Sequence, residues 1–298
     1  MAPTSVCAMI CNLCPRNCAA ERTETKSGGV CSQPVLPVVA KAMLHQWEEP
    51  CLVGRHGAGT VFFTGCNLRC CFCQNGPISR EGVGRAVSVE RLREIFRELI
   101  AQGAACLDLV TPTHFSHAII EALGEEGWGV PVVWNCGGYE KVETLRALEG
   151  KVQVYLPDFK YAIAEKAKKY SAAEDYFEVS TAAILEMFRQ TGPYVLEDGR
   201  LKRGVLIRHL ILPGELENTR RCIDWVAANF RPGEVLFSLM SQYTPQPGAA
   251  GNLARHVTKA EYRAAVTYME NCGIEDGFTQ ERTSAKEEYT PDFDLQGV

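Results

Sequence analysis

The sequence predicts an α/β protein in which helices cover a mainly parallel sheet. Two observations indicate this class. From residue 60 onward, short apolar runs alternate with segments of helical periodicity, and such alternation is typical of βαβ units. The chain also has 298 residues, 46% of them hydrophobic, which suffices for one large core with an appendage. Right-handed crossovers then give either an open doubly wound sheet or a barrel, and the pattern does not choose between them.

Six strands and six helices are expected in this alternation. The segment 60–64 (TVFFT) is short, β-branched and aromatic, as a buried strand is. The helix 88–102 has Ser88 at its N-cap position and apolar residues at helical spacing. The other expected strands are 106–110, 130–134, 152–156, 205–211 and 235–239, and the other expected helices are 116–123, 141–148, 178–190, 218–229 and 259–271.

Three regions are expected along the chain. Residues 1–50 look irregular and contain five cysteines, so we expect a small segment stapled by a metal. Residues 51–275 form the α/β domain. Residues 276–298 form a C-terminal tail that packs on it.

Composition narrows the class of protein. The net charge of −5 argues against binding of nucleic acid through bulk charge. No run of about 18 apolar residues predicts a transmembrane helix, and residues 1–10 do not resemble a secretory signal. Fourteen cysteines in such a chain indicate thiolates used for metal binding or catalysis. We therefore expect a cytoplasmic protein that binds neither membrane nor nucleic acid.

One cysteine motif directly follows the first expected strand. Cys66, Cys70 and Cys73 have the spacing C-x3-C-x2-C, which lets a single loop supply three thiolates to an iron–sulfur cubane. A cubane has four irons, so three ligands leave one iron open for chemistry. The alternative is a zinc knuckle or a set of core thiols. Structural zinc takes four protein ligands, and Cys71 is too close to Cys70 in sequence to serve the same ion easily.

A second set of cysteines lies near the N-terminus. Cys11, Cys14, Cys18 and Cys31 are expected to bind either zinc or a second iron–sulfur cluster, and the spacing does not decide between them. Cys7 is an additional candidate, and free thiols are the plain alternative. The remaining isolated cysteines are expected in the core; they include Cys51, Cys106, Cys222 and Cys272.

Several motifs together resemble one enzyme superfamily. The cluster motif carries an aromatic residue before its third cysteine, as in radical S-adenosylmethionine (SAM) enzymes. Within them the chain is similar to the uncharacterised PflX-like homologues of pyruvate formate-lyase activating enzyme. The resemblance covers nearly the whole chain and rests on the runs GAGTVFF (57–63), LVTPTH (109–114), YLPDFKY (155–161), RHLILPG (208–214) and SLMSQYTP (238–245), and on C-x2-C-P-R-x-C from Cys11. It implies a partial (β/α)6 TIM barrel.

The resemblance also implies an activity. In such enzymes the open iron of a [4Fe–4S] cluster chelates SAM, and reduced flavodoxin or ferredoxin supplies an electron. Reductive cleavage of SAM then yields a 5′-deoxyadenosyl radical that abstracts hydrogen from a substrate. The cofactors carry this chemistry, while the protein positions them. The substrate is unknown; an activating enzyme would act on a protein.

By resemblance, three residues are expected at the SAM site. Phe72 would contact the adenine. Asp158 and Lys160 match an Asp-x-Lys pair on the fourth strand, where the Asp helps to hold a monovalent cation beside the SAM carboxylate. The alternative for these two residues is a simple ion pair.

Three further residues are expected at the ends of other strands. Asn135 and Cys136 fall where other ligands of that cation come from, and Arg208 falls where an arginine contacts SAM. Barrel enzymes place their chemistry at these carboxyl ends. The plain alternatives are a turn residue for Asn135 and a barrel cap for Arg208.

The sequence departs from the superfamily in two places. The Gly-Gly-Glu segment that binds the SAM amine is replaced by residues 111–114, so backbone carbonyls, Thr111 or Thr113 would have to supply that contact. His114 would face the substrate or be structural. The segment 56–59 (HGAG) replaces the signature of glycyl-radical activases, which weakens the case for a glycyl radical enzyme as substrate.

Two other functions are compatible with the motifs. One is a non-catalytic iron–sulfur electron carrier or scaffold, in which Cys71 or an N-terminal cysteine would be the fourth ligand. The other is a radical SAM enzyme that modifies a small molecule.

Overall fold

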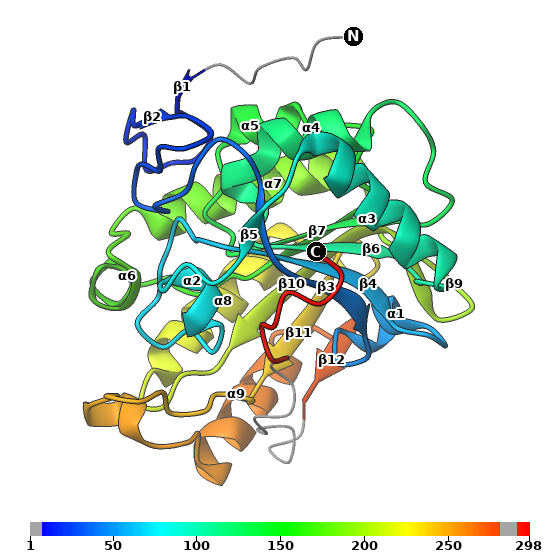
Figure 1. Ribbon diagram of the computed structural model, residues 1–298. Helices are drawn as coiled ribbons and strands as arrows, with labels where there is room; N and C mark the ends of the chain where they lie inside the picture. The colour runs from blue at the N-terminus through cyan, green and yellow to red at the C-terminus, as the bar shows by residue number, and fades with distance from the viewer. Residues whose placement is uncertain (1–7, 281–290) are drawn as a thin grey trace, which may run out of the picture.

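The computed structural model describes residues 8–280 and 291–298, and a parallel sheet forms its centre (Figure 1). Each central strand pairs in parallel with the next, so the predicted parallel sheet is confirmed. The central strands are β4 (Ala58–Phe63), β6 (Leu107–Val110), β7 (Val132–Cys136), β8 (Val154–Pro157), β10 (Arg200–Leu210) and β11 (Leu236–Met240).

The order of these strands is that of a barrel. They lie side by side in sequence order, β4-β6-β7-β8-β10-β11, without the reversal of a doubly wound sheet. In the described part of the chain the sheet is not closed: β12 (Gly277–Thr279) lies at one edge and β5 (Arg85–Ala86) at the other. The structure is therefore an open sheet in barrel order.

The expected helices form close to their predicted bounds. The Ser88 hydroxyl accepts the Arg91 N–H at 3.1 Å, so Ser88 is the N-cap of α3 as predicted. The sequence pattern did not reveal α6 (Ala164–Ser171). The other helices of the alternation are α3 (Val89–Ala101), α4 (Ser116–Leu123), α5 (Val142–Arg146), α7 (Tyr176–Thr191), α8 (Leu216–Asn229) and α9 (Lys259–Asn271).

The N-terminal region differs from the prediction. A short hairpin of β1 (Met9–Ile10) and β2 (Glu21–Arg22) is followed by β3 (Val38–His45), which pairs antiparallel with β4. The predicted boundary at residue 50 is therefore wrong, because residues 38–45 belong to the main sheet. This strand is buried almost throughout, even at Lys41, which forms an ion pair with Asp294 at 3.0 Å.

A short helix fills the inside of the curved sheet. The α1 residues Cys51 and Leu52 (α1, Pro50–Val53) pack against inner-face side chains such as Val133 and Val154. Alternate residues on each strand point the other way, toward the helices, where the main core lies. The inner face is therefore closed below by α1 and open at the carboxyl ends of the strands.

The C-terminal residues also join the core. β12 adds to the sheet beside β11, and residues 291–298 run along β3, where the Leu295 N–H donates to the Ala40 carbonyl at 3.2 Å. Phe293 meets Phe62 edge to face, with ring centroids 5.6 Å apart. The expected tail thus packs on the domain at 291–298, and residues 281–290 lie outside the described residues.

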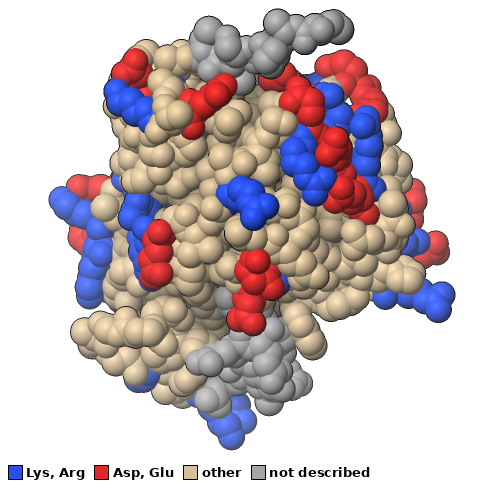
Figure 2. All heavy atoms as spheres, in the orientation of Figure 1, with Lys and Arg blue, Asp and Glu red and all other residues tan. Residues whose placement is uncertain are grey.

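Charged side chains occur in mixed groups on the face seen in Figure 2. Ion pairs between side chains at the surface of the molecule include Arg91–Glu98 at 2.6 Å and Arg97–Glu126 at 3.0 Å. This face has no broad area of one sign. Within the described residues, no helix combines the length and apolar character needed to cross a membrane.

The packing of α1 predicts a strong stability effect. Leu52 is 2% exposed and Leu185 is 44% exposed. Leu52→Ala should lower the free energy of unfolding by about 2–5 kcal/mol, because a cavity forms under the sheet. Leu185→Ala, the matched exposed control, should change it by less than about 0.5 kcal/mol. Urea unfolding measures both, and equal effects would show that α1 does not support the sheet.

Candidate active site

A polar cavity opens at the carboxyl ends of the central strands, beside the cysteine motif 66–73. Its wall combines residues of the strands β3, β4, β6, β7, β10 and β11 with Cys70, Phe72 and Cys73. Strand alternation explains the selection, because side chains two residues apart point to the same face. The inner-face and loop residues used below are Asn135 of β7, Asp158 and Lys160 after β8, Arg208 and Leu210 of β10, and Met240 of β11.

The three motif cysteines lie on one loop. Burial and then the neighbouring Cys70 raise the pKa of the Cys66 thiol to about 12, and the charge of Cys73 acts in the same direction. The Cys73 N–H donates to the Cys70 carbonyl at 3.1 Å, which closes the turn. Since like charges and burial both oppose ionisation, a positively charged group is needed to keep these three thiols together as thiolates.

The surroundings of these sulfurs suit thiolate ligands. The Leu68 N–H donates to Cys66 Sγ at 3.3 Å, and the Ser171 hydroxyl donates to Cys70 Sγ at 2.9 Å. The Lys160 charge lowers the pKa of Cys70 against the larger effect of burial. Donors and a cation directed at sulfur stabilise the ionised form. These residues fit a cluster bound by Cys66, Cys70 and Cys73.

A single ion and a cubane differ in the spacing of thiolates that they require. In a cubane each thiolate binds a different iron, so its sulfurs are farther apart than those around one zinc. Among the described residues, no three His, Cys, Asp or Glu side chains converge as ligands of one metal ion.

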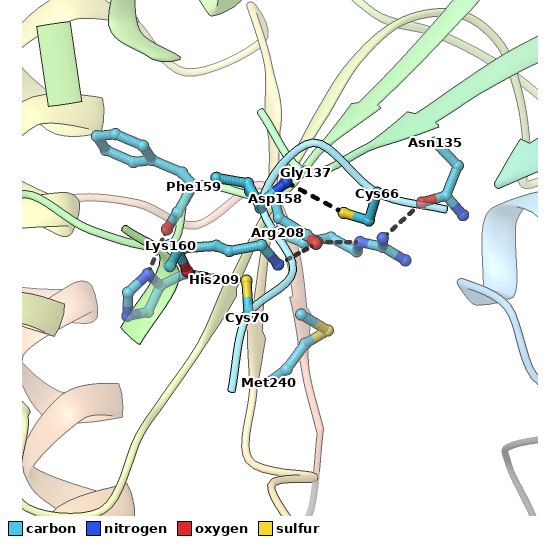
Figure 3. Close-up of polar contacts among 12 residues, drawn as sticks. Cys66, Cys70, Asn135, Gly137, Asp158, Phe159, Lys160, Arg208, His209 and Met240 are labelled. Carbon is cyan, nitrogen blue, oxygen red and sulfur yellow. Dashed lines mark hydrogen bonds and ion pairs between the residues drawn. The ribbon is translucent and has the colours of Figure 1, made fainter. Parts of the chain in front are cut away.

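Asp158 lies between two cations in this cavity (Figure 3). Its Oδ2 accepts from Lys160 Nζ at 2.5 Å and its Oδ1 accepts from Arg208 Nε at 3.0 Å. Burial opposes ionisation of Asp158, yet these two charges outweigh it and hold its pKa below the usual range. The carboxylate is therefore ionised and both oxygens are occupied by protein cations.

Arg208 also binds the neighbouring strands. Its Nη2 donates to Asn135 Oδ1 at 2.7 Å, and its Nη1 donates to Glu48 Oε1 at 2.9 Å. Asn135 Nδ2 in turn donates to Glu48 Oε2 at 3.0 Å. Sequence analysis missed Glu48, which enters the cavity from the loop before α1 and carries no motif that would reveal it.

Two further acids lie beneath Arg208. Burial raises the pKa of Glu49 to about 7, and burial with the Glu48 charge raises the pKa of Asp108 well above its usual range. Both carry a buried oxygen without a hydrogen-bond partner. The carboxyl groups of Glu49 and Asp108 are therefore harder to ionise than usual, whereas the ionised Asp158 lies between Arg208 and Lys160.

Two residues expected at a monovalent cation, Asp158 and Cys136, differ in their placement. Both carboxylate oxygens of Asp158 already accept from protein cations, so a further cation would have to displace one of these partners. Cys136 is adjacent to Asn135, so its side chain points to the opposite face, into the core beneath the helices. Its backbone carbonyl accepts the Asp158 N–H at 2.9 Å. Cys136 therefore positions the strand end and does not line the cavity.

Phe72 lies in the cavity wall. Its ring meets the rings of Tyr161, Tyr170 and Tyr243 edge to face, at centroid distances of 6.5, 6.1 and 6.4 Å. These aromatic contacts pack the cysteine loop against α6 and the segment after β11. The face of Phe72 toward the cavity is the part that a ligand can contact.

The residues that replace Gly-Gly-Glu are structural. The Thr113 hydroxyl donates to Glu140 Oε1 at 2.6 Å in the core, away from the cavity. Thr111 has φ +59°, and its N–H donates to the Asn135 carbonyl at 2.8 Å. His114 donates from Nε2 to the Thr64 carbonyl at 2.7 Å, and burial lowers its pKa to about 3. His114 is thus a neutral core histidine and does not face the cavity.

The N-terminal cysteines also gather in space. Cys11, Cys14 and Cys31 are buried and Cys18 is exposed, while Cys7 lies outside the described residues. Burial raises the pKa of Cys14 to about 12, with smaller contributions from the Cys31 and Cys11 charges. The Cys18 sulfur lies next to Gly29, and the Cys31 thiol lies 3.7 Å from the Gly28 carbonyl, so these two cysteines adjoin the same turn.

Other cysteines behave as predicted for core residues. Cys51, Cys106 and Cys222 are buried, and Cys272 is partly buried at the end of α9. Burial is the first cause of the raised pKa of Cys222. These thiols are protonated and chemically quiet.

Sequence analysis missed the role of Arg16. Its Nε donates to the Asn67 carbonyl at 2.7 Å and its Nη2 to the Ser171 carbonyl at 2.7 Å. Asn67 lies between the first two motif cysteines, and Ser171 contacts Cys70. The proline and arginine after Cys14 were visible as a motif, but their distant partners were not.

Comparisons with known proteins support the fold. No family model matches the sequence. The uncharacterized protein MJ0674 of Methanocaldococcus jannaschii is 27% identical over 282 residues, which are 89% of this chain and 75% of that protein.

Solved structures of similar fold include Streptococcus suis SuiB. SuiB bound to S-adenosylmethionine gives a TM-score of 0.52 at 12% identity, over 77% of this chain and 52% of SuiB. SuiB bound to the precursor peptide SuiA gives 0.50 at 11% identity, over 73% and 47%. The chain therefore spans about half the length of SuiB and shares its α/β fold over that part.

The buried Glu140 predicts a pH dependence of stability. Burial raises its pKa from 4.5 to about 7, so the folded state binds more protons than the unfolded state between these values. Its contribution to stability therefore falls as pH rises through this window. Glu140→Gln removes this titration. Its free energy of unfolding should therefore rise relative to that of the wild type as the pH increases from 5 to 8, by up to about 3 kcal/mol.

Urea unfolding at several pH values measures this difference. Glu81→Gln is the exposed control and should show a nearly constant difference. A constant difference for Glu140→Gln as well would mean that Glu140 titrates normally.

Proposed function

We propose that this chain is a radical SAM enzyme. One observation carries the proposal: the loop with Cys66, Cys70 and Cys73 opens onto a polar cavity at the carboxyl ends of the parallel strands. When bound, a [4Fe–4S] cluster and SAM supply a 5′-deoxyadenosyl radical for hydrogen abstraction. The likeness in fold to SuiB, which has been solved with S-adenosylmethionine bound, supports this assignment.

The residues of the chain have distinct tasks in this proposal. The motif cysteines bind the cluster, and the Leu68 N–H and Ser171 hydroxyl stabilise two of the thiolates. Asp158 and Lys160 bind the charged groups of the methionine part of SAM. Asp158 and Lys160 now pair with each other. When SAM binds, each can pair with an oppositely charged group of SAM, so that no buried charge is left without a partner.

Arg208 acts through other residues. It holds Asp158 and Asn135 in place and neutralises Glu48 beneath them. In this proposal it is a positioning residue, and its predicted direct contact with SAM is replaced by these three contacts.

The cavity favours an enzyme over an electron carrier. A carrier needs no internal ligand space, whereas here two cations and the carboxyl groups of Asp158 and Glu48 line a cavity beside the thiols. Cys71, the candidate fourth ligand of a carrier, is exposed on the outer side of the loop, and its N–H donates to the Tyr170 carbonyl at 2.9 Å.

Partners are part of the same proposal. Reduced flavodoxin or ferredoxin supplies the electron. SuiB has been solved with a precursor peptide, and we propose a protein or peptide as the substrate here; a small molecule is the alternative to be distinguished by assay.

Replacement of single cysteines tests the cluster. Cys70→Ala should abolish reductive cleavage of SAM and lower the iron content of anaerobically reconstituted protein, because a ligand is lost. Cys71→Ala, the adjacent control, should retain both. The readouts are 5′-deoxyadenosine formation with dithionite and iron per chain. A Cys70→Ala protein that forms 5′-deoxyadenosine at the wild-type rate would overturn the assignment.

Replacement of Asp158 tests the SAM site. Asp158→Asn keeps the shape but loses the charge, so it should weaken SAM binding at least tenfold, which is about 1.4 kcal/mol. Equilibrium binding to reconstituted protein measures this. Asp198→Asn, on an exposed turn, is the control and should bind normally. Unchanged affinity in Asp158→Asn would place SAM elsewhere.

A further inference from the structure

The N-terminal hairpin brings its cysteines around one small space. Cys18 lies against Gly29, where an added Cβ would come within 2.7 Å of its sulfur, and the Cys31 thiol lies 3.7 Å from the Gly28 carbonyl. Cys11 directly follows β1 and Cys14 lies in the turn beyond it, and both are buried. Four thiols from residues 11–31 thus face one region beside the main sheet.

A buried guanidinium adjoins these thiols. Arg22 is 0% exposed, and its Nη1 lies 3.3 Å from Cys11 Sγ. Its other partners are backbone carbonyls, of Pro34 at 3.0 Å and His114 at 2.8 Å. No carboxylate forms an ion pair with Arg22 in the part of the chain that is described. A fully buried cation needs a counter-charge, and thiolates bound to a metal would supply it.

A single zinc ion and an iron–sulfur cluster require different spacings of the thiols. Four thiolates around one zinc must lie about 3.8 Å apart, given Zn–S bonds of about 2.3 Å, whereas thiolates on a cubane each bind a different iron and lie farther apart. Within residues 8–280 and 291–298, neither this set nor Cys66, Cys70 and Cys73 forms a single-ion site.

Hydrogen bonds connect the N-terminal segment 11–33 with the loop that carries Cys66, Cys70 and Cys73. Arg16, two residues after Cys14, donates to the Asn67 carbonyl at 2.7 Å. Arg69 donates to the Val30 carbonyl at 3.1 Å and to the Ser32 hydroxyl at 3.2 Å, on either side of Cys31.

The approach is closest at Gly65. An added Cβ on Gly65 would lie 2.9 Å from the Cys31 carbonyl, and Gly65 precedes Cys66. The backbone next to one set of thiols therefore touches the backbone next to the other.

We propose that Cys11, Cys14, Cys18 and Cys31 bind a second iron–sulfur cluster that relays electrons to the first. The relay, though not the second site, rests on the proposed function. A reduced flavin or iron–sulfur protein gives one electron to the second cluster and is oxidised. The second cluster then passes that electron to the first and returns to its original state. Cys18 is the exposed ligand, so the donor docks on its side.

Metal analysis of three full-length proteins tests the second site. These are the wild type, Cys66→Ala/Cys70→Ala/Cys73→Ala and Cys11→Ala/Cys14→Ala/Cys18→Ala/Cys31→Ala, each reconstituted anaerobically. The wild type should bind about eight irons with matching sulfide, and the triple variant about four. The triple variant should also keep an electron paramagnetic resonance signal after reduction with dithionite.

Several outcomes would overturn the second site. A triple variant without iron, or with one zinc per chain and no sulfide, would do so, as would about four irons in the wild type. If the quadruple variant does not fold, Cys18→Ala is tested in its place. Added to the triple variant, this single substitution should alter the electron paramagnetic resonance signal that remains there. Cys272→Ala is the control and should leave iron content and spectra unchanged.

A second measurement tests the relay. The rate of SAM cleavage supported by reduced flavodoxin, divided by the rate supported by dithionite, should fall at least tenfold in Cys18→Ala. An unchanged ratio would refute the relay. If no protein cleaves SAM with either reductant, the proposed function fails, while the iron content still decides the second site.

Discussion

The Arg208 guanidinium compensates the buried carboxylates on the inner face of the sheet, and the shape of the cavity depends on this. It contacts Asp158 of the next strand end, Asn135 of β7 and Glu48 of the loop before α1. Removing one partner of a buried charge pair commonly costs about 3–5 kcal/mol, because the other charge stays buried. The same contacts fix the positions of three separate segments around one side chain.

This arrangement explains why the cavity can be polar without being unstable. Burial raises the pKa values of Glu49 and Asp108, while Asp158 stays ionised between two cations. Lys160 then lies between Asp158 and the thiol of Cys70. Lys160, which Asp158 holds in place, thus compensates part of the negative charge of the thiolate ligands.

The N-terminal hairpin and the first cysteine loop depend on each other. Arg16 and Arg69 donate in opposite directions across their contact, and both bind backbone carbonyls. Carbonyl acceptors make such contacts insensitive to the identity of the accepting residue. A change in the metal ligation of one set of cysteines would therefore shift the backbone that carries the other set.

The sequence by itself determined what depends on local spacing. It specified the six helices of the alternation, of which Lys259–Asn271 begins at a capping box with Thr258, but not α1 or α6. It also specified the central parallel strands and the loop that carries Cys66, Cys70 and Cys73. Only the tertiary structure decided what depends on distant pairs. Lys41 is buried in β3 because Asp294, 253 residues away, pairs with it. Asn135 lines the cavity and Cys136 does not, because strand alternation separates neighbours and the pattern left the register open. Glu48, Arg16 and Arg22 have no motif of their own, since their partners are brought near only when the sheet has formed.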